Sequence, residues 1–244
     1  MHKLFKYSLH FILLLTTINI TETGKTQGYS YGGLGYNASY LKSEGLDFVI
    51  DRYNETRPYL TTIMPYNRYY DGITAHFGGA ANYFAYDIGF TYRSSVVSAS
   101  GIDGSGIEVQ RDLKNKWNTW DFSMGINLGN SDTKALTIGI NTALDSEKSL
   151  TRSDTPDKIG VANFAKVNSA FKIGFEPYIQ LILATEEGFG ILLKPYYSWT
   201  PVKTDYSELN QYINPYTYIN DPIPIEGNLS GFGINIILIG YGEN

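Results

Sequence analysis

The strongest constraint on the fold of this chain is a period-two alternation of apolar and polar residues. In FAYDIGFTYR (84–93), every second residue from Phe84 to Tyr92 is aromatic or aliphatic, and the residues between include Asp87 and Arg93. A β-strand points successive side chains to opposite faces, so this segment predicts a strand with one apolar and one polar face.

The same alternation recurs in seven further segments, which makes eight predicted strands. They are GLGYNASYL, GITAHFG, WNTWDFSMGINLG, ALTIGINTALD, AFKIGFEPYIQLIL, FGILLKPYYSW and SGFGINIILIGY. In the last of these, Ile237 and Ile239 blur the alternation. With 21 Tyr, 12 Phe and 25 Gly among 244 residues, the composition also favours an all-β protein.

The connections between these strands alternate between short and long. The short ones lie at 79–82, 129–134 and 185–188, and the long ones at about 42–71, 94–116, 146–166 and 200–227. This layout is typical of outer-membrane barrels, in which a closed sheet leaves no backbone group unpaired in lipid. The sequence therefore predicts an eight-stranded antiparallel up-and-down transmembrane β-barrel over residues 28–241, with short periplasmic turns and long extracellular loops.

A soluble eight-stranded barrel of the lipocalin kind is the alternative, because alternation alone does not say which face points inward. The polar face carries glycines and charges of both signs, which suits a narrow filled lumen better than an apolar ligand pocket. Rings also gather near one end of the strands, where a lipid-facing aromatic girdle is expected. Its predicted members are Tyr92, Trp120, Phe171, Tyr197, Trp199 and Phe232.

The N-terminus predicts export. Lys3 and Lys6 precede the apolar stretch FILLLTTINI, so residues 1–27 are expected to be a signal peptide cleaved between Thr21 and Gln27; a short buried helix is the alternative. The chain has no cysteine and a net charge of −5, with no basic stripe for a nucleic acid. The expected location is the outer membrane of a Gram-negative bacterium, with membrane lipid as a partner.

Charged residues on the polar face are expected to form a network inside the barrel. The candidates are His76, Asp87, Arg93, Asp121, Asp145, Lys172, Glu176 and Lys194. Eight strands leave a lumen just wide enough for side chains, and buried charges must pair. Lys172, Glu176 and Lys194 lie on neighbouring strands and are expected to share one network. The network plugs the barrel or, alternatively, lines a path for a small polar solute.

The sequence gives little support to an enzyme. His76 is the only histidine after residue 27, and it lies near a short turn, away from cell-surface chemistry. No clustered His, Asp and Glu set indicates a metal site. The GIDGSG segment predicts a projecting hairpin, but it lacks the further acidic ligands of a twelve-residue calcium loop. We therefore expect no catalytic residue, cofactor or metal.

The long loops hold the residues best suited to recognition. In residues 43–58, apolar side chains at helical spacing, from Leu46 to Tyr53, predict a short amphipathic helix that ends before Pro58. It either caps the barrel mouth or lies at the membrane surface. Tyrosines cluster at 66–70 and at positions 206, 212, 216 and 218, where they would contact an extracellular ligand or protein, or form an interfacial belt.

In strand layout and face chemistry, residues 28–241 resemble the small eight-stranded outer-membrane barrels of the OmpA/OmpX/OmpW-like class. The resemblance implies a non-enzymatic role in surface interaction or envelope integrity; the alternative is a narrow channel or transporter for small polar or apolar solutes. Two features depart from the class. Gly242 follows Tyr241, whereas such barrels usually end on an aromatic residue, and no periplasmic domain is expected after the barrel.

Overall fold

Eight long strands form one closed ring in the computed structural model, which describes residues 28–81, 83–131, 134–154, 163–185 and 187–243. The expected signal peptide, residues 1–27, lies outside the described residues. In chain order the eight strands are β1 (Tyr29–Lys42), β3 (Tyr69–Ala81), β4 (Phe84–Ile102), β5 (Glu108–Ser131), β6 (Lys134–Asp154), β7 (Ala165–Ala184), β8 (Phe189–Ser198) and β11 (Ser230–Glu243).

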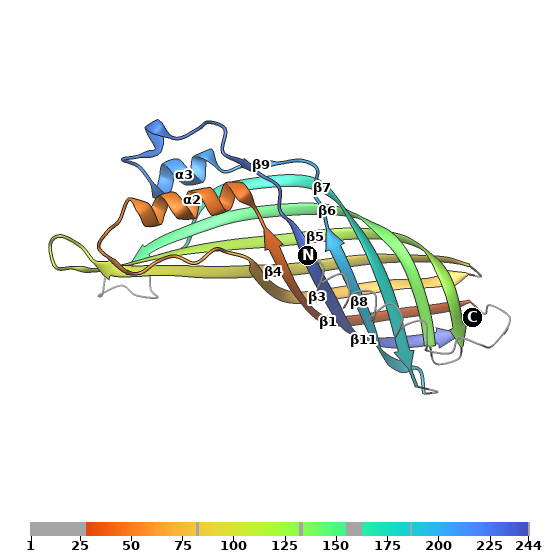
Figure 1. Cartoon of the computed structure of the whole chain (residues 1–244). Helices are drawn as coiled ribbons and strands as arrows, with labels where there is room; N and C mark the ends of the chain where they lie inside the picture. Colours follow the sequence, from red (N-terminus) through yellow and green to blue (C-terminus); the bar gives the residue numbers. More distant parts are fainter. Residues whose placement is uncertain (1–27, 82, 132–133, 155–162, 186, 244) are drawn as a thin grey trace, which may run out of the picture.

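Every strand of the ring pairs antiparallel with its neighbours, and β1 closes the ring by pairing with both β3 and β11. At that closure Tyr36 lies opposite Ile236 on one side and Ile73 on the other. The order β1-β3-β4-β5-β6-β7-β8-β11 is a simple meander (Figure 1). The predicted fold class, an eight-stranded antiparallel up-and-down barrel, is confirmed.

The apolar face of the strands points outward and the polar face inward. Ile88 is 50% exposed whereas its neighbour Asp87 is 3% exposed. The two isoleucines that blur the alternation, Ile237 and Ile239, point inward and are buried. The outward side chains with large exposed apolar area include Leu34, Ile73, Phe77, Phe84, Tyr86, Phe122, Met124, Ile126, Ile138, Ile173, Ile191 and Leu238.

The barrel wall is taller on one side than on the other. Strands β4 to β7 have 19 to 24 residues, whereas β8 has 10. Two of the predicted long loops, 94–116 and 146–166, are therefore wrong in large part, because β4 continues to Ile102, β5 begins at Glu108 and β6 continues to Asp154. Stretches such as SSVVSASG lack the apolar alternation by which the other strand segments were predicted.

The tallest hairpin, β4–β5, ends at the GIDGSG segment, as predicted. Asp103 Oδ1 accepts hydrogen bonds from the backbone N–H groups of Ser105 and Ile107, at 2.9 and 3.0 Å. Gly106 has a φ of +78°, which favours glycine at this position.

The remaining elements cover the long-loop end of the barrel. They are α2 (Glu44–Glu55), β2 (Leu60–Thr62), β9 (Thr204–Asp205), α3 (Ser207–Ile213), η2 (Tyr218–Asn220) and β10 (Glu226–Gly227). The two helices lie beside each other at this end (Figure 1). Among the described residues, no helix is both long and apolar enough to cross a membrane.

The predicted helix over 43–58 is α2, which starts after Ser43, whose Oγ accepts a hydrogen bond from Leu46 N. Its apolar face does not lie on the membrane surface. Leu46 and Ile50 belong to one buried cluster with Leu113, an inward residue of the tall wall. Of the two placements that the sequence left open, α2 has the one that caps the mouth.

Candidate functional site

The lumen is filled in three layers, and the layer at the short-turn end is apolar. Its buried members are Tyr29, Tyr31, Ala80, Ala85, Ala135, Ile182, Leu192, Ile237, Ile239 and Tyr241. We call this layer the apolar floor. The sequence analysis did not predict this layer, although Ile237 and Ile239 occupy inward-pointing positions of the last strand and so indicated it.

Asp87 is the centre of the lower polar layer. Its Oδ1 lies 2.8 Å from His76 Nδ1, 3.1 Å from Lys194 Nζ and 3.2 Å from Ser123 Oγ. Tyr31, from the apolar floor, donates its hydroxyl to the other oxygen, Oδ2. One carboxylate thus receives donors from four strands, β1, β3, β5 and β8.

Arg93 is the centre of the upper polar layer. Its Nη1 donates to the Tyr196 hydroxyl at 2.5 Å and its Nη2 donates to Thr119 Oγ1 at 3.2 Å. Glu176 Oε1 lies 3.8 Å from Nη2, and the guanidinium carbon lies 4.5 Å from the Trp117 ring centroid. Trp117 and Tyr196 are rings on the polar face, and sequence reasoning did not include them.

Lys194 and Glu176 share a network, as expected, through Ser123 and Asn141: Lys194 Nζ donates to Ser123 Oγ at 2.8 Å, and Asn141 Nδ2 donates to Glu176 Oε2 at 3.1 Å. Among the described residues, no direct ion pair joins Glu176 to either lysine. Lys172 Nζ pairs with Glu147 Oε2 at 2.7 Å, whereas Lys194 extends across the lumen to Asp87. Each lysine side chain is long enough to reach a carboxylate other than that of Glu176. Glu147, which sequence reasoning placed in a loop, is an inward residue of the strand extension and is 2% exposed.

Glu147 joins the barrel to its cap, which comprises α2, α3 and the segments around them. Tyr206 donates its hydroxyl to Glu147 Oε1 at 2.8 Å, and Thr204 donates to Oε2 at 3.0 Å. Burial, with the nearby Glu147 carboxylate, raises the pKa of Tyr206 well above its ordinary value. Tyr206 is fully buried. Its predicted exposure in a contact surface is therefore wrong, while Tyr216 is 92% exposed.

Two ion pairs and a hydrogen bond from a side chain to a backbone carbonyl hold the cap together. Arg52 Nε lies 2.8 Å from Asp221 Oδ1, and Arg68 Nη2 lies 2.8 Å from Asp47 Oδ2. Arg57 Nη2 donates to the carbonyl oxygen of Ile213, at the end of α3, at 2.5 Å. These contacts tie α2 and the residues that follow it to α3, to Asp221 and to the segment before β3.

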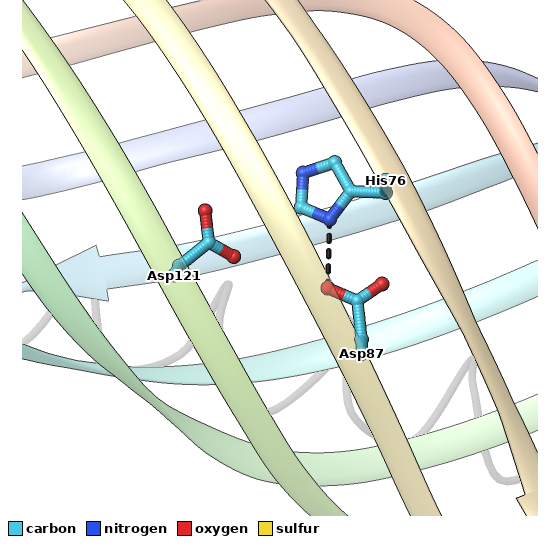
Figure 2. Close-up of side chains that lie close together, drawn as sticks. All are labelled: His76, Asp87 and Asp121. Atoms are coloured by element: carbon cyan, nitrogen blue, oxygen red, sulfur yellow. Dashed lines mark hydrogen bonds and ion pairs between the residues drawn. The ribbon is translucent and has the colours of Figure 1, made fainter.

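His76, Asp87 and Asp121 form a buried cluster whose ligand-type atoms lie within 4.8 Å of one another (Figure 2). Gly89 makes room for it, since a Cβ there would lie 2.5 Å from His76 Cε1 and 2.6 Å from Asp121 Oδ1. Lys194 Nζ lies 3.1 Å from Asp87 and 3.8 Å from Asp121. The Lys194 ammonium group already lies beside both carboxylates, where a metal ion would bind, so the cluster is a poor metal site.

The candidate girdle residues lie on the outer face, several in ring pairs. Tyr197 and Phe232 have centroids 4.9 Å apart, and Trp120 lies 4.8 Å from Phe90. Phe171 is 69% exposed. Trp199 packs 6.2 Å from Phe175, and Tyr92 is half-buried beside its neighbours on β3 and β5.

An apolar outer face around a charged, filled interior is the reverse of a soluble ligand-binding barrel. The fold is that of the small eight-stranded outer-membrane barrels. No protein-family model matches the sequence, and no curated protein matches it either.

Several solved structures are similar to the chain, including the following three. Ail, the attachment invasion locus protein of Yersinia pestis, in complex with the heparin analogue sucrose octasulfate, is 12% identical with a TM-score of 0.44, over 88% of this chain and 98% of that one. Neisserial surface protein A is 7% identical with a TM-score of 0.38, over 87% and 96%. The translocator domain of the autotransporter NalP from Neisseria meningitidis is 11% identical with a TM-score of 0.34, over 99% and 97%.

Proposed function

We propose that this chain is a closed, non-enzymatic barrel of the Gram-negative outer membrane that presents its cap to an extracellular ligand or protein. The observation that carries the proposal is the set of buried side chains that fill the barrel, in the apolar floor, the two polar layers and the cap. A filled barrel offers no path to a solute, so its capped end is the part left for interaction. Residues 1–27 act as the export signal in this proposal.

Conductance in planar bilayers tests the closed barrel against the alternative, a narrow channel. Pure protein should insert without giving stable single-channel steps. Reproducible steps of one size would overturn the closed barrel and favour the channel. The matched variant Arg57→Ala, which removes the donor to Ile213 O, shows whether loosening the cap alone opens a path.

Cysteine labelling tests the orientation, because the chain has no cysteine of its own. Tyr216→Cys at the capped end should react with a membrane-impermeant maleimide on intact cells. Tyr83→Cys, which is 71% exposed at the short-turn end, should react only after permeabilisation. The reverse pattern would place the cap in the periplasm.

A surface variant separates the two roles contained in the proposal. Tyr216, Ile219 and Ile223 are 92%, 74% and 71% exposed on the cap, so replacing all three with serine should leave the fold intact. If the role is surface interaction, this variant should lose attachment of expressing cells while still restoring the detergent resistance of a deletion strain. If the role is envelope integrity alone, both readouts should match those of the unchanged protein.

A further inference from the structure

Three oxygen atoms from two segments converge beside Gly174 on the inner face of β7. A Cβ atom placed on Gly174 would lie 3.1 Å from Asp145 Oδ2, 3.4 Å from Thr200 Oγ1 and 3.4 Å from the carbonyl oxygen of Trp199. Asp145 comes from β6, and Trp199 and Thr200 follow β8. The glycine therefore leaves a small space whose nearest walls are a carboxylate, a hydroxyl and a carbonyl.

Two of these oxygens have no hydrogen-bond partner among the described residues. Asp145 and Thr200 are both 0% exposed, and neither Asp145 Oδ2 nor Thr200 Oγ1 has a hydrogen bond. Trp117 lies near the Asp145 carboxyl, but its Nε1 likewise has no hydrogen bond of normal geometry. An unpaired buried polar group costs about 1–3 kcal/mol, more if it is charged, so a guest that satisfies both oxygens would stabilise the barrel.

The charges of the lumen favour a positive guest. Inside the barrel the buried acids are Asp87, Asp121, Asp145, Glu147 and Glu176, and the buried bases are Arg93, Lys172 and Lys194. Five negative and three positive charges leave 3 − 5 = −2 when His76 is neutral.

The bases are already engaged elsewhere. Lys172 pairs with Glu147, Lys194 with Asp87 and Asp121, and Arg93 with Glu176. Among the described residues, no basic group lies within ion-pair distance, 4.0 Å, of Asp145. Asp145 is therefore the lumen acid whose charge is least compensated by direct contact.

We propose that the space beside Gly174 binds a hard cation, with Asp145 Oδ2, Thr200 Oγ1 and the Trp199 carbonyl oxygen as its protein ligands. Carboxylate, hydroxyl and carbonyl oxygens are the ligand types that Ca²⁺ and Na⁺ take, while nitrogen or sulfur ligands would indicate a softer metal. The site differs from the His76 cluster, where an ammonium group takes the cation's place.

Thermal unfolding of the chelator-treated full chain in detergent micelles tests the site. CaCl₂, MgCl₂, NaCl and KCl are compared with choline chloride at equal ionic strength. Ca²⁺ or Na⁺ should raise the Tm in proportion to the logarithm of its concentration, as expected for a ligand that binds only the folded state. Whichever ion gives the shift identifies the cation. Equal Tm values in all five salts would overturn the proposal.

Two variants locate the effect. Asp145→Asn removes the ligand charge and Gly174→Ala places a methyl group in the space; each should abolish the ion-specific shift. Asp71→Asn, on the outer face, and Gly104→Ala, whose Cβ would meet nothing within 4 Å, should keep it. A shift that survives in Asp145→Asn would overturn the site.

Terbium gives a second readout on the unchanged chain, so the test does not depend on how the variants fold. Tb³⁺ replaces Ca²⁺ at oxygen sites, and Trp199 supplies a ligand atom next to its own indole. Tryptophan-sensitised Tb³⁺ luminescence should appear on titration and be lost on adding the ion that raises the Tm. Luminescence that is absent, or that this ion does not displace, would contradict the proposal.

Discussion

Lys194 Nζ lies 3.1 Å from Asp87 Oδ1, and this ion pair crosses the lumen from β8 to β4. The two strands are four places apart in the eight-stranded ring, so they stand on opposite sides of it. Arg93 and Tyr196 repeat the same crossing one layer higher, at 2.5 Å. The interior is thus braced across its full width, and both braces lie in the path that a solute would need.

Removing the lysine of this pair should destabilise the barrel strongly. Lys194→Met leaves Asp87 and Asp121 with less compensation, and breaking a buried pair in this way costs about 3–5 kcal/mol. The free energy of unfolding in urea, measured in detergent or lipid, checks the prediction. Lys203→Met breaks an exposed pair with Glu226 and should cost at most about 1 kcal/mol. Similar losses in the two variants would mean that the crossing pair is not what braces the lumen.

The assignment of the two strand faces gives a second prediction. Ile88 is 50% exposed on the outer face, so Ile88→Arg should impair insertion into lipid by about 2–4 kcal/mol if it lies near the bilayer midplane. Thr91→Ser on the inner face keeps the hydroxyl that lies 2.8 Å from Thr74 Oγ1, and should be mild. Folding yield into vesicles, read from heat-modifiable gel migration, gives both values. Equal effects would contradict the face assignment.

The sequence predicted the wall of the barrel better than its ends. Within lipid, each strand must show an apolar outer face, so alternation such as that of residues 84–93 identifies strand, face and direction together. Beyond the lipid this constraint disappears. Residues 94–102 and 146–154 are strand, yet their composition is that of a loop.

The ion-pair partners inside the lumen could not be predicted from the alternation of inward and outward residues alone. The alternation of inward and outward residues placed Lys172 and Lys194 inside the barrel. It did not identify their partners, because a lysine side chain is long enough to reach several carboxylates. The apolar floor was missed for a different reason. The alternation of β11 was judged by its outer face, so Ile237 and Ile239 looked like irregularities, whereas they are the inner face of the lowest layer.

The seam between β7 and β8 has an interruption that leads to a third prediction. Phe175 and Trp199 exchange two backbone hydrogen bonds, so the facing pairs at 177/197 and 179/195 should do the same. Each of these pairs contains a proline, Pro177 or Pro195, which has no N–H to donate. Neither pair is part of the β7–β8 ladder, which has Tyr178 opposite Tyr196 and then continues from Leu181 opposite Leu193.

Restoring one donor should strengthen this seam. Pro195→Val supplies an N–H facing the carbonyl oxygen of Ile179, and should stabilise the barrel by about 1 kcal/mol, the usual net value of one hydrogen bond. Urea unfolding in detergent measures the gain. Pro201→Val, outside the sheet, should give none, since it adds no ladder bond. A loss of stability in Pro195→Val would mean that the proline is needed for the local path of β8.

The cap should loosen at alkaline pH. The pKa values of Tyr206 and Tyr53, both buried under the cap, are raised above the ordinary value, chiefly by burial. The folded state therefore holds these protons more tightly than the unfolded state does. Their contribution to stability is complete below about pH 10 and falls as the pH rises beyond it, by up to about 1.4 kcal/mol per pH unit for each group.

Limited proteolysis of the 200–227 segment between neutral and strongly alkaline pH, followed by tyrosinate absorbance, measures this loosening. Cleavage should rise together with ionisation of the buried tyrosines, while the barrel keeps its heat-modifiable migration. Tyr53→Phe with Tyr206→Phe should flatten the pH profile, because neither ring can then ionise. Tyr216→Phe, at a ring that is 92% exposed, should leave the profile unchanged. An alkaline transition of the same size in the double variant would show that another group releases the cap.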